Sequence, residues 1–174
     1  MSEYIPSPRD WVAKQVALYE SSGGTQGLIL RNTDLPVVIV TNRGWRTGAI
    51  RKTPVMRVVD GVNYILVASN GGAPKNPLWV HNLRVNPDVT VQDETNIYPR
   101  RAREIVDPAE RDRIWAIALE AFPLYQRYRD DAGQADRIIP VFIAEPVKAV
   151  SNKYLSGACP TPAGVTPVTR MVLA

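Results

Sequence analysis

The strongest constraint on the fold is a turn signal between two short segments in the middle of the chain. Residues 53–59 and 62–68 are rich in β-branched and aliphatic residues, and only Asp60 and Gly61 separate them. Asp-Gly in such a place is typical of a tight β-hairpin, whereas parallel strands need a crossover of about a dozen or more residues. The two segments therefore predict antiparallel strands, which disfavours a Rossmann-type sheet.

Similar segments and several helix signals complete the predicted fold. Asp107, Pro108 and Glu110 supply an N-cap, a first-turn proline and the acid of a capping box. Mostly antiparallel strands with helices at the ends and in one long crossover fit an α+β fold, a barrel of about six strands. The predicted strands are 36–41, 53–59, 62–68, 88–92, 101–106 and 138–144, and the predicted helices with their caps are 7–20, 76–85, 107–121 and a tyrosine-bearing stretch to about 131.

The length of 174 residues suits one domain of ordinary size. We expect an N-terminal helix and linker in residues 1–24 and a cofactor-binding barrel in residues 25–150. Residues 151–174 carry several prolines and glycines and few charges, which predicts a weakly ordered C-terminal extension.

Residue counts exclude several classes of site and location. Cys159 is the only cysteine and His81 the only histidine, which excludes an intramolecular disulfide and a Cys/His metal site, so we expect no metal. No apolar run approaches the ~18 residues of a membrane span, and no leader is evident. We expect a cytoplasmic protein and leave open whether the N-terminal helix touches a membrane.

The charge balance favours an anionic partner. The chain has 21 Lys and Arg against 17 Asp and Glu, a net charge of +4. Nucleic acid is disfavoured, because the basic run Arg100, Arg101 and Arg103 has Glu104 and Asp107 beside it. A small anionic molecule remains the better candidate.

The segment 41–52 is a candidate anion site between two predicted strands. It holds four cations, no acid and two glycines. Guanidinium forks and backbone N–H groups of such a hairpin suit phosphate or carboxylate oxygens. The alternative is an ordinary solubilising turn.

The segment 68–77 joins a predicted strand to a predicted helix through Gly71 and Gly72. Glycines permit a close approach of the backbone, and a helix N-terminus favours an anion. ATP and NAD are disfavoured, because neither a P-loop nor a dinucleotide fingerprint is present. The alternative is a plain connection.

Tyr125 and Tyr128 are three residues apart, so they share one face of a helix. Two phenols on one face can flank a flat substrate or donate a proton. The alternative is that both rings pack on the barrel with their hydroxyls in water.

Taken in order, these motifs resemble the deazaflavin-dependent nitroreductase family of actinobacterial reductases, which use coenzyme F-420. The resemblance spans residues 25–147. The matching motifs are Gly44-Trp45-Arg46-Thr47-Gly48 with Arg51 and Pro54, Ala68 to Trp79, Asn82-Leu83, Asn86-Pro87, Pro123 to Tyr128, Arg137 to Val141 and Glu145-Pro146.

The resemblance implies a split β-barrel related to the flavin-binding barrels. Arg46 and Arg51 match positions that hold the anionic tail of the coenzyme, and Tyr125 and Tyr128 match the wall of the acceptor pocket, with Tyr125 the expected proton donor. The cofactor-binding residues that the resemblance implies are Arg46, Thr47, Arg51, Pro54, Ser69, Asn70, Gly71, Gly72 and Asn82.

The implied activity is hydride transfer from reduced coenzyme F-420 to a small electron-poor acceptor, such as a quinone, an enone or a nitro compound. In this division of labour the coenzyme carries the hydride and the protein supplies alignment and placed donors. Two alternatives stay open, an FMN-dependent oxidoreductase and a cofactor-binding protein without turnover. The sequence leaves monomer and homodimer undecided.

Overall fold

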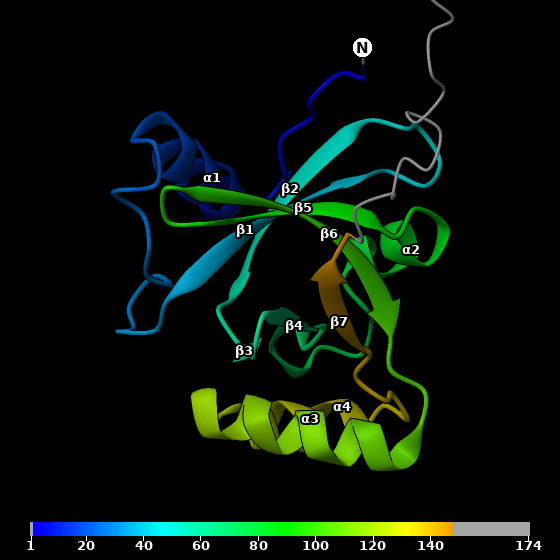
Figure 1. The fold of residues 1–174 in the computed structure, drawn as a ribbon. Coiled ribbons are helices and arrows are strands. Elements are labelled where there is room, and N and C mark those ends of the chain that lie inside the picture. The colour runs from blue at the N-terminus through cyan, green and yellow to red at the C-terminus, as the bar shows by residue number, and fades with distance from the viewer. Residues whose placement is uncertain (1, 148–174) are drawn as a thin grey trace, which may run out of the picture.

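The computed structural model describes residues 2–147, so the predicted C-terminal extension and the last three residues of the predicted barrel domain lie outside the described residues. All seven strands form one antiparallel sheet in the order β2-β1-β5-β6-β7-β4-β3. The sheet curls into a half-open barrel (Figure 1). The strands are β1 (Val37–Arg43), β2 (Ile50–Met56), β3 (Val59–Asp60), β4 (Asn63–Val67), β5 (Asp88–Asp93), β6 (Asn96–Glu104) and β7 (Val141–Pro146).

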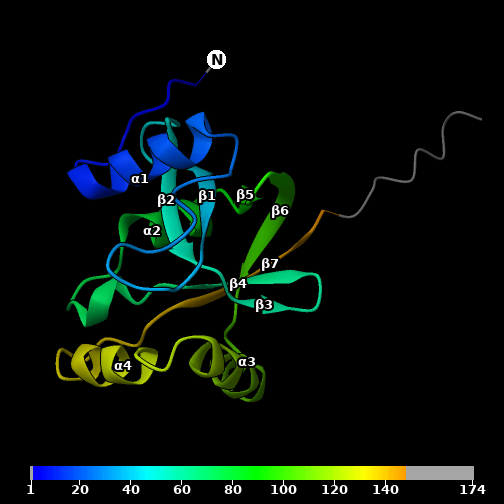
Figure 2. The ribbon, with the colours of Figure 1, turned by 90° about the vertical axis from the view of Figure 1, so that its left-hand side faces the viewer.

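The described part of the chain contains four α-helices, which pack around the sheet. Helices α3 and α4 lie side by side against the β3–β4 end of the barrel in both views (Figures 1 and 2), and α1 packs at the β1–β2 end. In residues 2–147 none of the helices combines the length and apolar character needed to cross a membrane. The helices are α1 (Asp10–Ser21), α2 (Leu78–Val85), α3 (Pro108–Ala121) and α4 (Tyr125–Gly133), and η1 (Asn70–Gly72) is a short 3-10 turn.

The predicted hairpin is confirmed, with its turn shifted by one residue. Asp60 pairs with Asn63 inside the ladder, so the loop consists of Gly61 and Val62. Gly61 has a φ of 60°, which a residue without a Cβ adopts at little cost.

The prediction of a single strand over residues 53–59 is wrong. It divides into β2 and β3, which lie at opposite edges of the sheet, so residues 57 and 58 must carry the chain across. The sheet consequently has seven strands rather than six. A run of β-branched residues predicts extended backbone but does not reveal which neighbour pairs with it.

Several element boundaries also differ from the predictions. Helix α1 begins at Asp10 rather than directly after Ser7, and the N-cap position of α2 is Pro77 rather than Asn76. Strand β6 begins at Asn96, before the predicted 101, and β7 begins at Val141, after the predicted 138.

The cap of α3 is confirmed in part. The Glu110 backbone N–H donates to Asp107 Oδ1 at 2.8 Å. The Glu110 carboxylate does not return to the N-cap, because it accepts two hydrogen bonds from Arg103 at 2.9 and 3.0 Å. An arginine on the neighbouring strand therefore replaces the reciprocal half of the capping box.

Strands β1, β4 and β7 are buried on both faces, which explains their continuous apolar runs. In β1, Val38 and Val40 face the barrel interior, whereas Val37 and Ile39 pack beneath α1. Alternate residues of β4 divide in the same way between the interior and the layer of α3 and α4. The apolar side of α1, formed by Val12, Val16 and Tyr19, is covered by β1.

The segment before α1 extends the sheet at β2, which the sequence reasoning missed. The Ile5 N–H donates to the Ile50 carbonyl at 3.0 Å, and the Ile50 N–H donates to the Glu3 carbonyl at 2.8 Å. Tyr4 and Ile50 form an isolated parallel bridge. From there the chain continues across the barrel surface to α1.

Candidate functional site

Two adjoining cavities lie where the barrel meets the N-terminal segment, α2 and α4. The cavity bordered by Tyr125 and Tyr128, here called the tyrosine cavity, has a volume of about 510 Å³. The cavity bordered by the β1–β2 connection, here called the hairpin cavity, has a volume of about 780 Å³. Residues shared by both linings are Ser7, Pro8, Thr53, Leu78 and Trp79.

The predicted site residues divide between these two cavities. Gly72 lines neither cavity. The tyrosine cavity contains Pro54, Ser69, Asn70, Gly71, Tyr125 and Tyr128, and the hairpin cavity contains Arg46, Thr47, Arg51 and Asn82.

The charges on the cavity walls all have one sign. Neither lining contains an aspartate or a glutamate. Of the basic residues, Lys52 pairs with Glu20 at 2.6 Å, whereas Arg46 stacks over the Trp45 ring, with its guanidinium carbon 4.4 Å from the ring centroid. Cations without acids beside them attract an anionic ligand.

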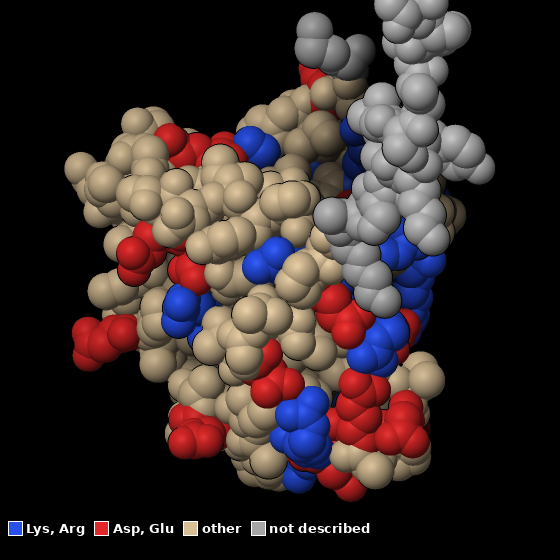
Figure 3. Space-filling model, in the orientation of Figure 1, with Lys and Arg blue, Asp and Glu red and all other residues tan. Residues whose placement is uncertain are grey.

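Several charged side chains outside the cavities form ion pairs. Arg101 pairs with Asp88 at 2.7 Å and Arg103 with Glu110 at 2.9 Å. Figure 3 shows basic and acidic side chains next to one another on one face of the molecule. The basic run on β6 is therefore partly neutralised.

Asn82 supports the hairpin cavity from α2. Its Oδ1 accepts from the Trp45 N–H at 3.0 Å, and its Nδ2 donates to Asn42 Oδ1 at 2.7 Å. The side chain is 5% exposed. Both polar atoms thus already have partners, and they hold the β1–β2 connection in place.

Arg51 joins the hairpin cavity to the N-terminal segment. Its Nη1 donates to the carbonyl oxygens of Ile5 and Pro6 at 3.2 and 3.4 Å. Two backbone acceptors therefore use one end of the guanidinium, and its remaining N–H groups are the donors available to a ligand.

The loop between β4 and α2 is held by Arg137. This guanidinium donates to the carbonyls of Ala68 and Ser69 at 3.0 and 2.6 Å and to Asn76 Oδ1 at 2.9 Å. Burial lowers the pKa of Arg137. Within the described residues no carboxylate forms an ion pair with it, so its positive charge adds to the cationic character of the loop.

Gly72 packs the same loop against α4. It has a φ of 79°, and a Cβ there would lie 2.9 Å from Asp131 Cβ and 3.2 Å from the Tyr128 carbonyl oxygen. Gly71 has open space where a Cβ would stand. Of the two glycines, only Gly71 offers its backbone to the tyrosine cavity.

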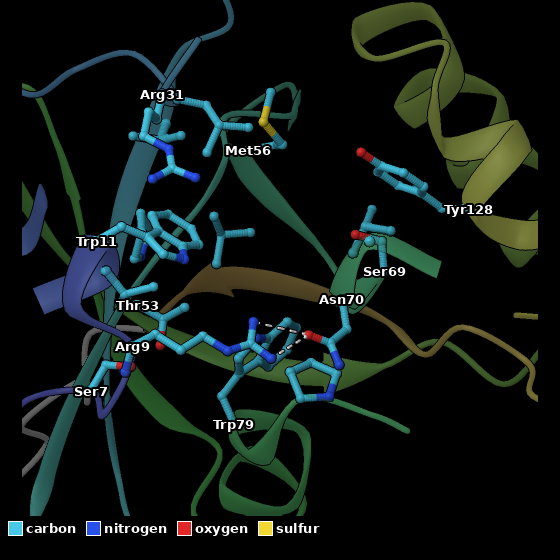
Figure 4. Close-up of a pocket in the computed structure, with 18 of the residues that line it drawn as sticks. Ser7, Arg9, Trp11, Arg31, Thr53, Met56, Ser69, Asn70, Trp79 and Tyr128 are labelled. Carbon is cyan, nitrogen blue, oxygen red and sulfur yellow. Dashed lines mark hydrogen bonds between the residues drawn. The ribbon is translucent and has the colours of Figure 1, made fainter. Parts of the chain in front are cut away.

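The two tyrosines occupy different environments. Tyr125 is 1% exposed and packs edge-on against Phe122, with 4.8 Å between ring centroids. Burial raises the pKa of Tyr125, which makes it a weaker acid. Tyr128 is half-buried and points from α4 toward the cavity (Figure 4).

Several lining residues come from segments that the sequence analysis assigned to a separate N-terminal helix or left without a role. Arg9, Trp11 and Arg31 form the wall opposite Tyr128, and Trp79 lies at the boundary of the two cavities (Figure 4). Arg31 lies over Trp11, 5.8 Å from the ring centroid. One tryptophan and two arginines near the start of the chain were the sequence signal that could have indicated this wall of the cavity.

Comparison with known proteins decides the family. Residues 11–146 match the family described as F-420H(2)-dependent quinone reductase. The chain belongs to this family. It is 33% identical over 132 residues to an F-420H(2)-dependent quinone reductase of Mycobacterium tuberculosis, a match that covers 73% of this chain and 84% of that protein.

Solved structures agree with the family and the fold. An F-420-H2 dependent reductase, FDR-A, is 44% identical with a TM-score of 0.58, over 63% of this chain and 94% of that one. A structure described as a domain-swapped dimer is 42% identical with a TM-score of 0.60, over 80% of this chain and 100% of that one. The predicted α+β split barrel and deazaflavin-dependent reductase family are confirmed, and the FMN alternative gains no support.

The residues present fit coenzyme F-420. Its flat deazaflavin ring needs an apolar cavity, and its phospholactyl-oligoglutamate tail needs cations without competing acids. Both adjoining cavities combine apolar lining residues with cations and contain no acidic residue, and the N-terminus of α2 lies at their boundary, since Leu78 and Trp79 line both. Arg46 and Arg51 are the side chains that would hold the tail.

Proposed function

We propose that this protein is a reductase that uses reduced coenzyme F-420 to reduce a quinone. The observation that carries the proposal is the adjacency of two cavities without acidic lining residues, one bordered by Arg46 and Arg51 and the other by Tyr125 and Tyr128, in a member of this family. Bound reduced coenzyme supplies two electrons as a hydride, and the quinone becomes a hydroquinone by gaining this hydride and a proton.

The protein's own part in this function is binding and alignment. Arg46 and Arg51 bind the tail, while the loop at Ser69 and Gly71 borders the space for the ring. Positioning two reactants side by side replaces an encounter in solution and lowers the entropic part of the barrier. The half-buried phenol of Tyr128 is placed to donate a hydrogen bond, or a proton, to an oxygen that gains negative charge.

Finer features of the activity belong to the same proposal. Enones and nitro compounds are electron-poor acceptors that the tyrosine cavity would also admit by shape and polarity. The family name specifies quinones, so we place quinones first and the nitro compounds of the nitroreductase resemblance after them. The expected cytoplasmic location and actinobacterial origin remain predictions.

The test is turnover with purified protein and a naphthoquinone. We expect oxidation of reduced F-420 that depends on both protein and quinone, with binding of the coenzyme in the micromolar range or tighter. FMNH2 and NADPH serve as alternative donors and are expected to support little reduction beyond the rate measured without protein. Turnover with FMNH2 alone would overturn the proposal, and so would tight coenzyme binding without turnover of any quinone, enone or nitro compound.

A further inference from the structure

The tyrosine cavity has more positive charge than a neutral quinone requires. Its only charged lining residues are Arg9 and Arg31. In residues 2–147 neither has a carboxylate within ion-pair distance. By contrast, the arginines that do form ion pairs in this part of the chain all lie outside both cavities.

The two guanidinium groups are held loosely by neutral neighbours. Arg9 reaches Asn70 Oδ1 with two hydrogen bonds of 3.4 Å each, which is long for a charge-assisted contact. Arg31 contacts the Trp11 ring. Most of their N–H donors therefore have room for a ligand.

The cavity is polarised across its width. Arg9, Trp11 and Arg31 form one side, Tyr128 faces them from α4, and Met56 lies at the rim between (Figure 4). Val55 and Val67 are among its apolar lining residues. A flat molecule in this space would have a cationic group at one end and a phenol at the other.

These arginines are separate from the pair assigned to the coenzyme tail. Arg46 and Arg51 line the hairpin cavity, and neither appears in the tyrosine cavity. Trp79 and Leu78 stand at the boundary between them. The tail thus has cations of its own, which leaves Arg9 and Arg31 for an acceptor that lies beside the ring in the tyrosine cavity.

We infer that the acceptor is anionic, a quinone whose ring system carries a carboxylate, and that Arg31, assisted by Arg9, binds this carboxylate. The inference rests on the proposed function, because it names the acceptor class of the same site. A planar guanidinium binds a carboxylate through two parallel hydrogen bonds, which fixes direction as well as position. The carboxylate end would then face α1, with the reducible ring extending toward Tyr128.

The experiment compares two naphthoquinones that differ by one carboxylate, using wild type and Arg31→Gln. In each protein, the acceptor preference is measured as kcat/KM for the carboxylated quinone divided by kcat/KM for the neutral quinone. Comparing this preference between wild type and variant cancels the different intrinsic reactivities of the two quinones. We expect Arg31→Gln to lower kcat/KM for the carboxylated quinone about 10-fold to 100-fold, mainly by raising KM. For the neutral quinone, kcat/KM should fall less than about 3-fold.

Three further variants sharpen the comparison. Arg9→Gln should show the same selectivity with a smaller effect, and Arg31→Lys should retain part of the preference because it keeps the charge. Lys14→Gln is the matched control, since Lys14 is an exposed cation of α1 outside both cavities. It removes the same net charge, and its acceptor ratio should equal that of wild type.

A binding measurement separates failure of the inference from failure of the proposed function. Naphthoate, which is not reducible, should bind the protein loaded with oxidised F-420 and bind Arg31→Gln at least 10-fold more weakly. Equal naphthoate affinity, or equal loss with both quinones, would overturn the inference while leaving the reductase intact. Weaker coenzyme binding in Arg31→Gln with an unchanged acceptor ratio would reassign the arginine to the coenzyme. Absence of turnover with selective naphthoate binding would instead count against the reductase alone.

Discussion

Arg137 Nη2 donates a hydrogen bond of 2.6 Å to the carbonyl oxygen of Ser69. This contact joins the segment before β7 to a loop that lies 68 residues earlier in the chain and borders the tyrosine cavity. The same guanidinium also binds the Ala68 carbonyl, so the shape of the loop depends on one distant side chain.

We predict that Arg137→Met lowers the free energy of unfolding by about 2–3 kcal/mol, because it leaves carbonyl acceptors and Asn76 without their charged donor. Coenzyme affinity should fall together with stability, since the loop loses its support. Urea unfolding and fluorescence titration measure the two effects. Lys75→Met, an exposed change in the same loop, is the control and should alter stability by less than about 0.5 kcal/mol.

Arg46 tests the assignment of the hairpin cavity to the tail. Arg46→Ala should weaken binding of the complete coenzyme by about 1.5–3 kcal/mol, and added salt should weaken wild-type binding as well. A deazaflavin without the phospholactyl tail should bind the variant and wild type equally. Equal binding of the complete coenzyme to both proteins would remove Arg46 from the site.

The tyrosines should differ in their effect on chemistry. Tyr128→Phe keeps the ring and removes the hydroxyl that faces the cavity, so single-turnover oxidation of bound reduced coenzyme by a quinone should slow by about 10²-fold or more. Tyr125→Phe should cost less, because that phenol is buried and its ring packs near those of Phe122 and Trp115, which leaves it little contact with an acceptor. A larger loss with Tyr125→Phe would instead identify Tyr125 as the proton donor, as expected from the sequence.

Buried phenols predict a loss of stability at alkaline pH. Burial raises the pKa of Tyr125 above its ordinary value of 10.0. The pKa of Tyr64 is also raised, mainly by burial and in second place by its hydrogen bond to Asp93. Above pH 10 the unfolded chain releases these protons while the folded chain keeps them, so stability falls as pH rises. Urea midpoints at pH 8.5 and pH 11 should show this decrease, and Tyr125→Phe should make it smaller. A midpoint that does not change over this interval would contradict the assignment.

The sequence by itself was sufficient wherever a few neighbouring residues decide the structure. The Asp107 cap and the hairpin beyond Asp60 appeared as expected, because caps and tight turns depend on backbone and side-chain contacts within about four residues. The ordered motifs from Gly44 to Pro146 were also sufficient to predict the family. Motifs are local patterns, so they can be seen without a fold.

Tertiary structure alone decided which residues share a cavity. No local pattern indicates that Arg9 donates to the Asn70 side chain, or that Arg51 donates to the Ile5 carbonyl. Each of these hydrogen bonds joins segments tens of residues apart. Helical periodicity and residue propensity likewise could not separate Tyr125 from Tyr128, since both lie on one side of α4. Tyr125 is buried only because the folded chain packs it into a core cluster that includes Phe122 and Trp115. Contacts between segments that are distant in the sequence form the walls of the site. The burial of each side chain depends on these contacts and cannot be deduced from a short segment.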